Sequence, residues 1–300
     1  MGRSPLFAFL MGFKPPEQLI LDVRPEEDFL RGHLRGAYNV PWADMASRGF
    51  ELPTRSTPFT VCCAEEDLDE IQEWFDSRTK PWMATVQPVP EELPEEGPSA
   101  VGHFLFSVSP LLEDSEYLLE ELRMRHLPEV PKALDVGCGS GREAILLATR
   151  GWKVTALDRD QRALDRLGTL AERQAASSGN CSTRSLQGCN EICGSVCCTL
   201  ADSGDLLAAV EELGHFQLVM VNRHLHRPTL LEIVDLLAPG GLLLFHTFME
   251  GCSHPKDPEH LLRPGELSRT FGNALELLRD EELPGEDGRV MSFFVARKRS

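Results

Sequence analysis

The stretch ALDVGCGSGREAILLATRGWKVTALDRD, residues 133–160, joins two short apolar runs through a glycine-rich turn and a helical pattern. The glycines at 137, 139 and 141 follow the spacing G-x-G-x-G. Glycine lets the backbone turn sharply and come close to a ligand, and the first N–H groups of the following helix are free to bind one. This stretch therefore predicts a strand, a ligand-binding turn, a helix and a second strand.

Two residues restrict which ligand the turn accepts. Arg142 occupies the position where the dinucleotide fingerprint G-x-G-x-x-G requires its third glycine. Asp158 ends the second apolar run, where an acidic side chain is placed to hydrogen-bond the hydroxyls of a ribose. No Lys-Ser or Lys-Thr pair follows the turn, so the phosphate-binding loop of nucleoside triphosphatases is excluded as well.

Apolar runs and helical patterns alternate through the chain after residue 100. We expect strands at 132–137, 153–158, 216–222 and 242–248, and helices at 112–127, 142–151, 161–176 and 228–237. Repeated strand–helix units predict a parallel sheet covered by helices on both faces. The last two strand-like runs, 274–283 and 289–298, are separated by the turn-rich PGEDG and suit an antiparallel edge.

The segment DVGCGSG, together with Asp158, resembles the class I S-adenosylmethionine-dependent methyltransferases. The flanking sequence looks most like the tellurite-resistance-type branch, and the resemblance covers residues 101–300, including the segments VNRHLHRP and HPKDPEHLLRPGEL. It implies an α/β fold with a Rossmann-like seven-stranded sheet whose last strand is antiparallel. It also implies S-adenosyl-L-methionine as the cofactor and methyl transfer as the reaction.

The same resemblance implies roles for individual residues. The methionine and ribose side of the cofactor would contact Asp135, Gly137, Cys138, Gly139 and Gly141. Asp158 would hold the ribose hydroxyls, and Asp202 would contact the adenine. The alternative is an ordinary strand–turn–helix with surface acids. It suits Asp202 better than the glycine turn, because a short polar loop after a strand is common.

The residues that follow the strand 216–222 are the candidates for the methyl-acceptor side, since ligands bind beyond the carboxyl ends of parallel strands. The catalytic candidates are Asn222, Arg223, His226 and Arg227, with His224 beside them, and His246 and Phe248 are expected to line the site. A histidine can act as a base, and an arginine can bind an anionic acceptor. The alternative is that the arginines fix a loop and the histidines lie on the surface.

The composition is that of a soluble globular protein with a formal net charge of −17. No apolar run is long enough to cross a bilayer, so no membrane partner is expected. A phosphate backbone is normally bound by clustered Lys and Arg. No such cluster is present, which argues against a nucleic acid partner unless another subunit supplies a basic surface.

Nine cysteines and no export signal suggest a reducing compartment, the cytoplasm and possibly the nucleus. Five of the nine lie between Cys181 and Cys198, at a spacing that invites comparison with a zinc site. Cys197 and Cys198 fall in an apolar run, however, and no paired knuckle follows. We therefore expect free thiols and no metal.

The upstream segment LDVRPEEDFLRGHLRGAYNVP resembles the rhodanese (sulfurtransferase) family, over residues 1–90. The family pattern is carried by Asp22, Arg24, Phe29, Gly32, His33, Gly36, Ala37, Asn39 and Pro41. Cys63 stands at the position of the family's nucleophile, but Glu65, Glu66 and Asp67 replace the glycine- and arginine-containing anion cradle. Three carboxylates would raise the thiol pKa and repel an anionic sulfur donor, so we predict a small, largely non-catalytic α/β domain.

The sequence thus predicts a rhodanese-like domain at 1–90, a linker rich in proline and glutamate at 91–100, and a class I methyltransferase domain at 101–300. The expected reaction transfers a methyl group from S-adenosyl-L-methionine to a small or anionic acceptor. Three alternatives stay open: methylation of tRNA or a protein, a scaffold that senses the cofactor without turnover, and sulfur transfer coupled to methylation. The rhodanese-like domain would also serve to dock a protein partner.

Overall fold

A computed structural model describes residues 18–90, 93, 104–178, 192–285 and 288–299 of the chain. The chain divides into two compact units, Met1–Ser107 and Val108–Ser300. Leu105 belongs to the buried core of the first unit, so the division lies later than the expected boundary at residue 101. The expected linker, 91–100, lies outside the described residues except for Leu93.

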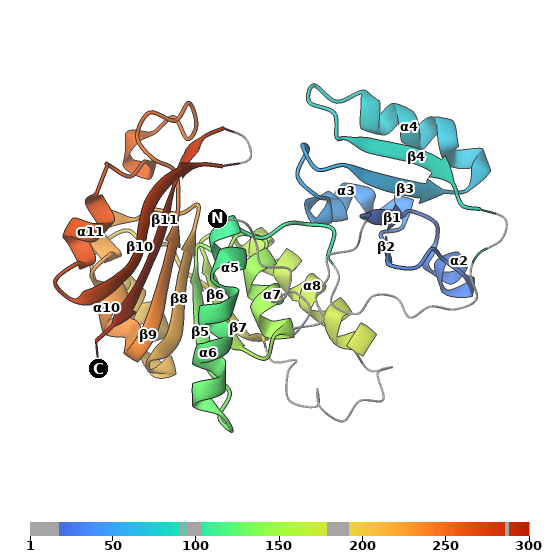
Figure 1. Ribbon diagram of the computed structural model, residues 1–300. Coiled ribbons are helices and arrows are strands. Elements are labelled where there is room, and N and C mark those ends of the chain that lie inside the picture. The colour runs from blue at the N-terminus through green and yellow to red at the C-terminus, as the bar shows by residue number, and fades with distance from the viewer. Residues whose placement is uncertain (1–17, 91–92, 94–103, 179–191, 286–287, 300) are drawn as a thin grey trace. The chain divides into compact units, whose positions relative to one another are not determined.

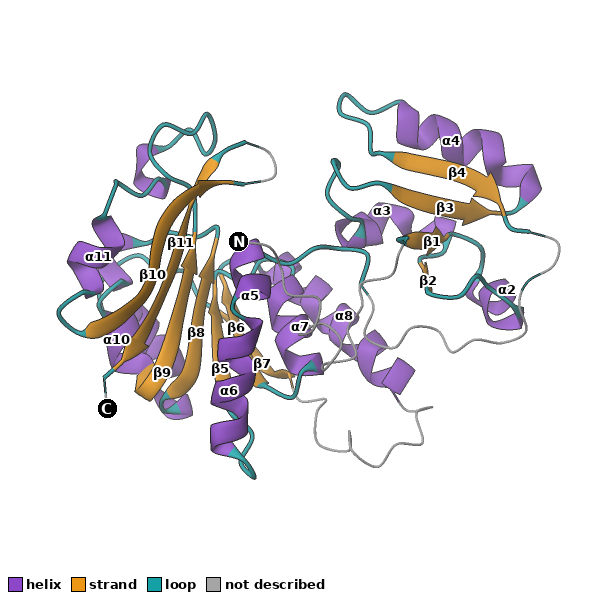
Figure 2. Ribbon diagram, viewed as in Figure 1, coloured by secondary structure: helices purple, strands orange, loops and turns teal. Residues whose placement is uncertain are grey.

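The first unit is built on a four-stranded parallel sheet in the order β2-β1-β3-β4 (Figure 2). Its strands are β1 (Ile20–Asp22), β2 (Ala37–Asn39), β3 (Phe59–Cys63) and β4 (Ala84–Pro88). Its helices are α2 (Glu26–Arg31), α3 (Met45–Arg48) and α4 (Leu68–Asp76), with 3-10 turns at η1 (Trp42–Asp44), η2 (Gly49–Glu51) and η3 (Glu65–Asp67). Every residue of β3 is buried, as expected of a central parallel strand.

The second unit is built on a seven-stranded sheet in the order β10-β11-β9-β8-β5-β6-β7 (Figure 1). Its strands are β5 (Lys132–Val136), β6 (Lys153–Asp158), β7 (Ile192–Cys197), β8 (Phe216–Asn222), β9 (Leu237–His246), β10 (Leu275–Pro284) and β11 (Val290–Lys298). The last strand, β11, is antiparallel to both of its neighbours, β9 and β10. The predicted seven-stranded α/β sheet with an antiparallel last strand is confirmed.

Seven helices accompany this sheet in the described part of the second unit. They are α5 (Pro110–Asp114), α6 (Glu116–His126), α7 (Arg142–Thr149), α8 (Gln161–Ser178), α9 (Asp205–Val210), α10 (Glu232–Leu236) and α11 (Glu266–Phe271), with 3-10 turns η4 (Glu211–Leu213), η5 (Arg227–Thr229) and η6 (Pro258–His260). None of the described helices is long and apolar enough to span a membrane.

Two of the expected helices are wrong in extent. The helix expected at 112–127 is two helices that meet at Ser115, because the backbone of Ser115 departs from the helical conformation. α5 begins at Pro110, where Ser109 caps it by accepting the Leu112 N–H. The helix expected at 228–237 ends at Leu236, and β9 already begins at Leu237. β9 pairs with β8 at Leu237 and again from Leu242, and the register shifts between these two pairs. The segment 239–241, where we expected only a stop, is therefore an irregularity within the strand.

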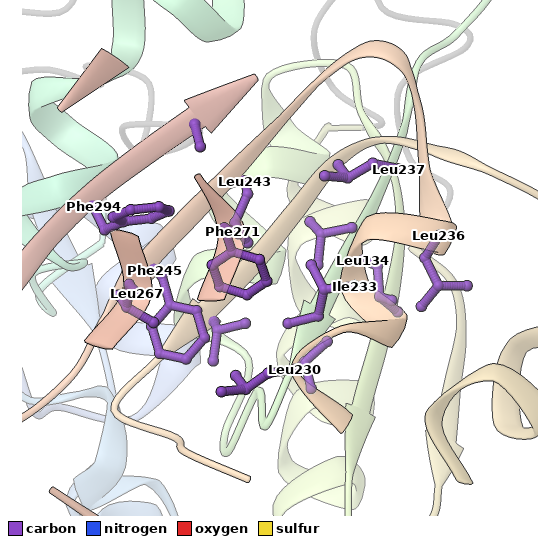
Figure 3. Packing of buried hydrophobic residues seen from close by; sticks show 14 of the residues in the cluster. Leu134, Leu230, Ile233, Leu236, Leu237, Leu243, Phe245, Leu267, Phe271 and Phe294 are labelled. Carbon is purple, nitrogen blue, oxygen red and sulfur yellow. The ribbon is translucent and has the colours of Figure 1, made fainter. Parts of the chain in front are cut away.

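One face of β5 packs into the hydrophobic core of the second unit, and the other face carries Asp135. Leu134 and Val136 belong to a buried cluster with residues of α10 and α11 (Figure 3). Each fully buried leucine or phenylalanine of this cluster stabilises the fold by roughly 1.5–3 kcal/mol. Because side chains alternate along a strand, Ala133 and Asp135 point to the opposite face.

Candidate active site

The candidate site lies where the order of the second sheet reverses. The chain passes from β5 to β6 and β7 on one side, and returns to β8 and β9 on the other side of β5. The carboxyl ends of neighbouring parallel strands meet at such a switch point, where ligands of open α/β sheets bind. In the paired strands Val136 lies opposite both Leu157 and Val221, so the ends of β5, β6 and β8 are adjacent.

The glycine loop between β5 and α7 has a backbone that only glycine adopts readily. Gly137, Gly139 and Gly141 have φ angles of 75°, 54° and 75°. A Cβ atom at Gly137 would lie 2.6 Å from Cγ of His224, and one at Gly141 would collide with Leu167. The loop is therefore fixed by both backbone conformation and close packing.

Asp158, at the end of β6, is tied to this loop. Its Oδ2 accepts a hydrogen bond from the backbone N–H of Gly139 at 2.8 Å, and its Oδ1 accepts one from Asp160 N–H at 2.9 Å. The second strand and the glycine loop thus meet through one carboxylate, which is partly exposed. A carboxylate in this place retains further lone pairs for a ligand.

Asp135 is the most unusual acid of the site. It is 1% exposed, and its Oδ2 atom has no hydrogen-bond partner among the described residues. Burial, and then the charges of Glu143 and Asp158, raise its pKa well above the usual value. Cys138, next in the loop, is buried, and burial also raises the pKa of its thiol. A buried acid without a partner costs stability unless a ligand supplies a donor.

Glu143, in the first turn of α7, was not predicted from the sequence. Its Oε1 accepts a hydrogen bond from Asn222 Nδ2 at 2.6 Å and another from Ser109 N–H at 3.0 Å. Glu143 is 7% exposed, and its burial raises the pKa of the carboxyl. In the sequence it has the appearance of an ordinary acid in the first turn of a helix, so nothing distinguished it there.

Arg223 follows β8 with a left-handed backbone, at φ 54°. It is the only described residue other than glycine with a positive φ, and its N–H donates to the carbonyl of His246 at 2.7 Å. Such strained conformations gather at functional sites. Its side chain is exposed, and its charge acts on Arg142, Glu143 and His246.

The three candidate histidines have different environments. His224 packs against Gly137, its Nε2 has no partner in the described structure, and burial lowers its pKa to about 4. His246 lies at 2% exposure with Nδ1 2.7 Å from the carbonyl of Ser292, and burial lowers its pKa to about 4 as well. His226 is partly buried, with Nδ1 3.1 Å from Thr229 Oγ1. A backbone carbonyl only accepts, so Nδ1 of His246 carries the proton.

Arg227 is held by residues outside the candidate site. Its Nε and Nη2 donate to the two carboxylate oxygens of Glu266 at 2.7 and 3.0 Å. Nη1 donates to the Glu259 carbonyl at 2.8 Å, and Nη2 to the Leu261 carbonyl at 2.7 Å. A bidentate pair with two added carbonyls is typical of an arginine that fixes a loop.

Asp202 and two of the cysteines lie at or after the end of β7. Asp202 is exposed, and its N–H donates to Asp205 at the start of α9. Cys197 ends β7 and is exposed, and Cys198 follows it. Cys181 and Cys189 lie outside the described residues, as does the side chain of Cys193. The described residues contain no group of three or more His, Cys, Asp or Glu able to hold a metal ion.

Cys63 ends β3 in the first unit and is fully buried. Burial, followed by the charges of Asp67, Asp22 and Glu65, raises the pKa of its thiol to about 11. The residues after it form the 3-10 turn η3, and its Sγ donates to the Gln87 carbonyl at 3.6 Å. Burial, which was not expected from the sequence, is the largest cause of the raised thiol pKa, and Asp67 and Glu65 of the acidic loop add to it as expected.

A sheet in this order, with a glycine loop after β5 and an acid at the end of β6, defines a Rossmann-like methyltransferase fold. A family model described as "Methyltransferase domain" matches residues 111–298, so the chain belongs to that family. A second model, "Rhodanese-like domain", matches residues 10–78. The second unit is a methyltransferase that uses S-adenosylmethionine, and it is preceded by a rhodanese-like domain.

Two curated proteins are similar to the chain. The "Uncharacterized protein UNK4.09" of Schizosaccharomyces pombe is 26% identical, with 93% of each chain covered. "Ribosomal RNA small subunit methyltransferase C" of Alcanivorax borkumensis is 28% identical over 46% of this chain and 39% of its own.

Solved structures of other methyltransferases have a similar fold at low sequence identity. TehB from Haemophilus influenzae is 17% identical, with a TM-score of 0.43 over 63% of this chain and 61% of its own. The N-methyltransferase NodS from Bradyrhizobium japonicum is also 17% identical, with a TM-score of 0.42 over 64% of this chain and 98% of its own.

The residues at the strand ends fit S-adenosylmethionine. Four buried polar atoms without a described partner lie on or directly after β5, β8 and β9: Asp135 Oδ2, Asn222 Oδ1, His224 Nε2 and Thr247 Oγ1. Buried polar groups normally have partners, so such a cluster at a switch point indicates a polar ligand. Thr247, like Glu143, was not predicted from the sequence.

Proposed function

We propose that the second unit methylates a small acceptor that carries an anionic group, and that Arg223 binds this group. The observation that carries the proposal is the exposed, left-handed Arg223 directly beside the unpartnered Asn222 and His224 atoms. A residue held in a strained conformation at a site of orphaned polar atoms is a candidate for ligand contact. Guanidinium is suited to carboxylate or phosphate because its planar donors match their geometry.

The donor side would be held by the residues of the glycine loop and the two acids. We assign Asp158 to bind the ribose hydroxyls and Asp135 to accept hydrogen bonds from other donor groups of the cofactor. The backbone of the glycine loop, residues 137–141, would lie directly against the cofactor. Asp202 would contact the adenine. S-adenosylmethionine, when bound, supplies a methyl group on a sulfonium, which is already a good leaving group. The protein therefore contributes mainly by alignment and by excluding water.

On the acceptor side, the roles of the remaining candidates are divided by their contacts. His226 is the candidate base, because its ring is partly accessible and bonded only to Thr229 Oγ1 among the described residues. Arg227 would act indirectly, by fixing the loop that follows β8, since its donors are engaged with Glu266 and neighbouring carbonyls. Asn222 belongs to the site itself.

We propose that the rhodanese-like unit has lost sulfur transfer and serves to dock a protein partner. The buried thiol of Cys63, with a raised pKa, supports the loss of sulfur transfer. Thiolate is the reactive form of cysteine, so a thiol with this pKa is a poor nucleophile at neutral pH. The six described cysteines are all free, which supports a reducing compartment such as the cytoplasm or nucleus.

Binding of the cofactor is tested by titration calorimetry with S-adenosylmethionine. The wild type is expected to bind, and Asp158→Ala to bind at least about tenfold more weakly, because a charge-assisted pair of hydrogen bonds is lost. Asp165→Ala is the matched control, since Asp165 is an exposed acid on α8. Absence of binding by the wild type would remove the methyltransferase proposal at its first step.

The class of acceptor is tested with cofactor labelled in the methyl group. A cell extract is divided into small molecules, RNA and protein, and each fraction is incubated with the wild type and with Asp158→Ala. We expect label in small molecules that bind an anion exchanger, and less label with Arg223→Ala. Label in protein, or none in any fraction, contradicts the proposal and favours protein methylation or a cofactor-sensing scaffold.

RNA is the second candidate acceptor. The similarity to "Ribosomal RNA small subunit methyltransferase C" over 46% of this chain favours it. The net charge of −17 opposes it, because RNA backbones are bound by clustered basic residues. Salt-dependent RNA binding together with label in the RNA fraction would establish this alternative.

A further inference from the structure

The side-chain amide of Asn222 is held in one orientation by Glu143. Oε1 of Glu143 accepts from Asn222 Nδ2 at 2.6 Å and from the Ser109 N–H at 3.0 Å. An oxygen that receives two N–H donors is acting as an acceptor, so the NH2 group of Asn222 must face it. Rotating the amide by half a turn would set two acceptor oxygens against each other inside the protein.

The consequence is that Oδ1 of Asn222 faces away from Glu143. This oxygen is buried, and no described residue donates a hydrogen bond to it. An amide oxygen only accepts, so the group that completes it must carry an N–H or O–H. Leaving it without a partner costs free energy, as buried polar groups in native proteins are nearly always bonded.

The position of Asn222 in the sheet indicates which ligand can donate the N–H or O–H to its Oδ1. Asn222 ends β8 and lies opposite His246 at the end of β9, one residue before the strained Arg223. The cofactor-side residues Asp135 and Asp158 lie on β5 and β6. Asn222 therefore lies between the residues assigned to the methyl donor and those assigned to the methyl acceptor.

We propose that Glu143 is a positioning residue that presents Asn222 Oδ1 to the methyl acceptor, and that the acceptor's reacting group is a neutral N–H or O–H. A tertiary amine, a thioether or an inorganic anion without a proton would leave Oδ1 unsatisfied. This inference rests on the proposed function and narrows its acceptor class. Glu143 acts through Asn222, which is the residue in contact with the acceptor.

Two cofactor analogues probe this oxygen without a known acceptor. In sinefungin a carbon that bears an amine replaces the sulfonium, so the amine stands in the place of the transferred methyl group. S-adenosylhomocysteine has a thioether sulfur and no group in the place of the methyl. The wild type is expected to bind sinefungin about tenfold more tightly than S-adenosylhomocysteine, because the amine donates to Asn222 Oδ1. Asn222→Ala and Glu143→Ala are expected to lose that preference, so that each variant binds the two analogues with affinities within about threefold of each other.

Conservative and matched variants separate positioning from a merely structural role. Glu143→Gln keeps an acceptor oxygen for the Asn222 NH2 group and is expected to restore the preference for sinefungin. Glu51→Gln is the control: Glu51 is another buried glutamate, 1% exposed and paired with Arg48 at 2.7 Å in the first unit. It is expected to keep both affinities at their wild-type values.

A nuclear magnetic resonance measurement keeps the inference testable if Glu143→Ala does not fold. One side-chain NH2 proton of Asn222 should resonate downfield in the wild type and move upfield in Glu143→Gln, since the bond loses its charge assistance. An unmoved resonance, a wild type without preference for sinefungin, or an unchanged preference in Asn222→Ala overturns the inference. Failure of the wild type to bind either analogue instead overturns the proposed function.

Discussion

Gly137 and His224 pack so closely that a Cβ atom at position 137 would lie 2.6 Å from Cγ and 2.7 Å from Cβ of the histidine. The first glycine of the loop after β5 is therefore in contact with the segment after β8, although 86 positions of sequence separate them. This contact joins the two halves of the sheet at its switch point. Because of this contact, substitution of Gly137 is expected to have a different effect from substitution of Gly139.

Gly137→Ala is expected to cost more than Gly139→Ala. Both glycines have a positive φ, which costs about 1–2 kcal/mol for a residue with a side chain. Only Gly137 adds a collision, since a Cβ at Gly139 meets no atom within 4 Å. Chemical denaturation and calorimetric titration with S-adenosylmethionine measure the two costs. Equal losses in both variants would show that the packing on His224 does not matter.

Asp135→Asn is expected to stabilise the ligand-free protein at pH 7 while weakening the binding of S-adenosylmethionine. The pKa of Asp135 is raised in the folded state, so its contribution to stability is full below the ordinary value of about 3.9 and is lost as the pH rises towards the folded pKa. Asparagine removes this loss because it has no charge to bury.

The measurement is the free energy of unfolding of both proteins from pH 4 to pH 8. The difference between the two profiles isolates Asp135 from Glu143, whose pKa is also raised, and from the histidines, whose low pKa values act in the opposite sense. The stabilising effect of Asp135→Asn should grow with pH. A difference that is constant with pH would contradict the raised pKa.

Cys63 is expected to react slowly with iodoacetamide at pH 7.5 and faster as the pH approaches its thiol pKa of about 11. Mass spectrometry of the Cys63 peptide measures the rate, with the exposed Cys197 as an internal reference for the reagent. The paired change Glu65→Gln and Asp67→Asn should speed the reaction by lowering the pKa. Thiosulfate:cyanide sulfurtransferase activity that disappears in Cys63→Ser would refute a non-catalytic domain.

Arg227→Gln is expected to lower the free energy of unfolding by about 1–3 kcal/mol, because Glu266 would remain partly buried without its partner. Denaturant unfolding gives the value. Arg125→Gln is the control, since the pair of Arg125 with Glu121 is an exposed contact on α6, where such pairs contribute about 0.2–0.5 kcal/mol. An effect of Arg227→Gln no larger than that of the control would show that Arg227 does not fix the loop.

The elements around the glycine loop were predictable because local signals agree there. Residues 133–158 combine short apolar runs, glycines at turn positions and a helical pattern, and the structure has β5, α7 and β6 in these places. The extents of two later elements were not predictable. Ser115 interrupts an otherwise continuous helical pattern. The segment 239–241 reads as a stop, although β9 begins before it at Leu237 and contains it as an irregularity in the pairing with β8.

The roles of the candidate site residues stay predictions. Asn222 and Arg223 were candidates because they come at the end of the apolar run 216–222, and in the structure they end and follow β8. The sequence offered no means to tell a free side chain from an engaged one. Arg227 is engaged by Glu266, a residue on α11, and by the carbonyls of Glu259 and Leu261, and no spacing rule connects these residues to it. Glu143 reaches Asn222 across 79 positions for the same reason.

The class of fold, the glycine loop and the acid of the second strand could be predicted from the sequence, because each depends on residues near one another along the chain. Which polar atoms have hydrogen-bond partners could be learned only from the folded chain. Asp135 Oδ2 and Asn222 Oδ1 are buried and have no described partner because of the strands and helices that surround them. A buried polar atom without a hydrogen-bond partner is unfavourable unless a ligand supplies one. Hydrogen-bond satisfaction is a property of neighbours in space, and those neighbours come from segments far apart in the chain.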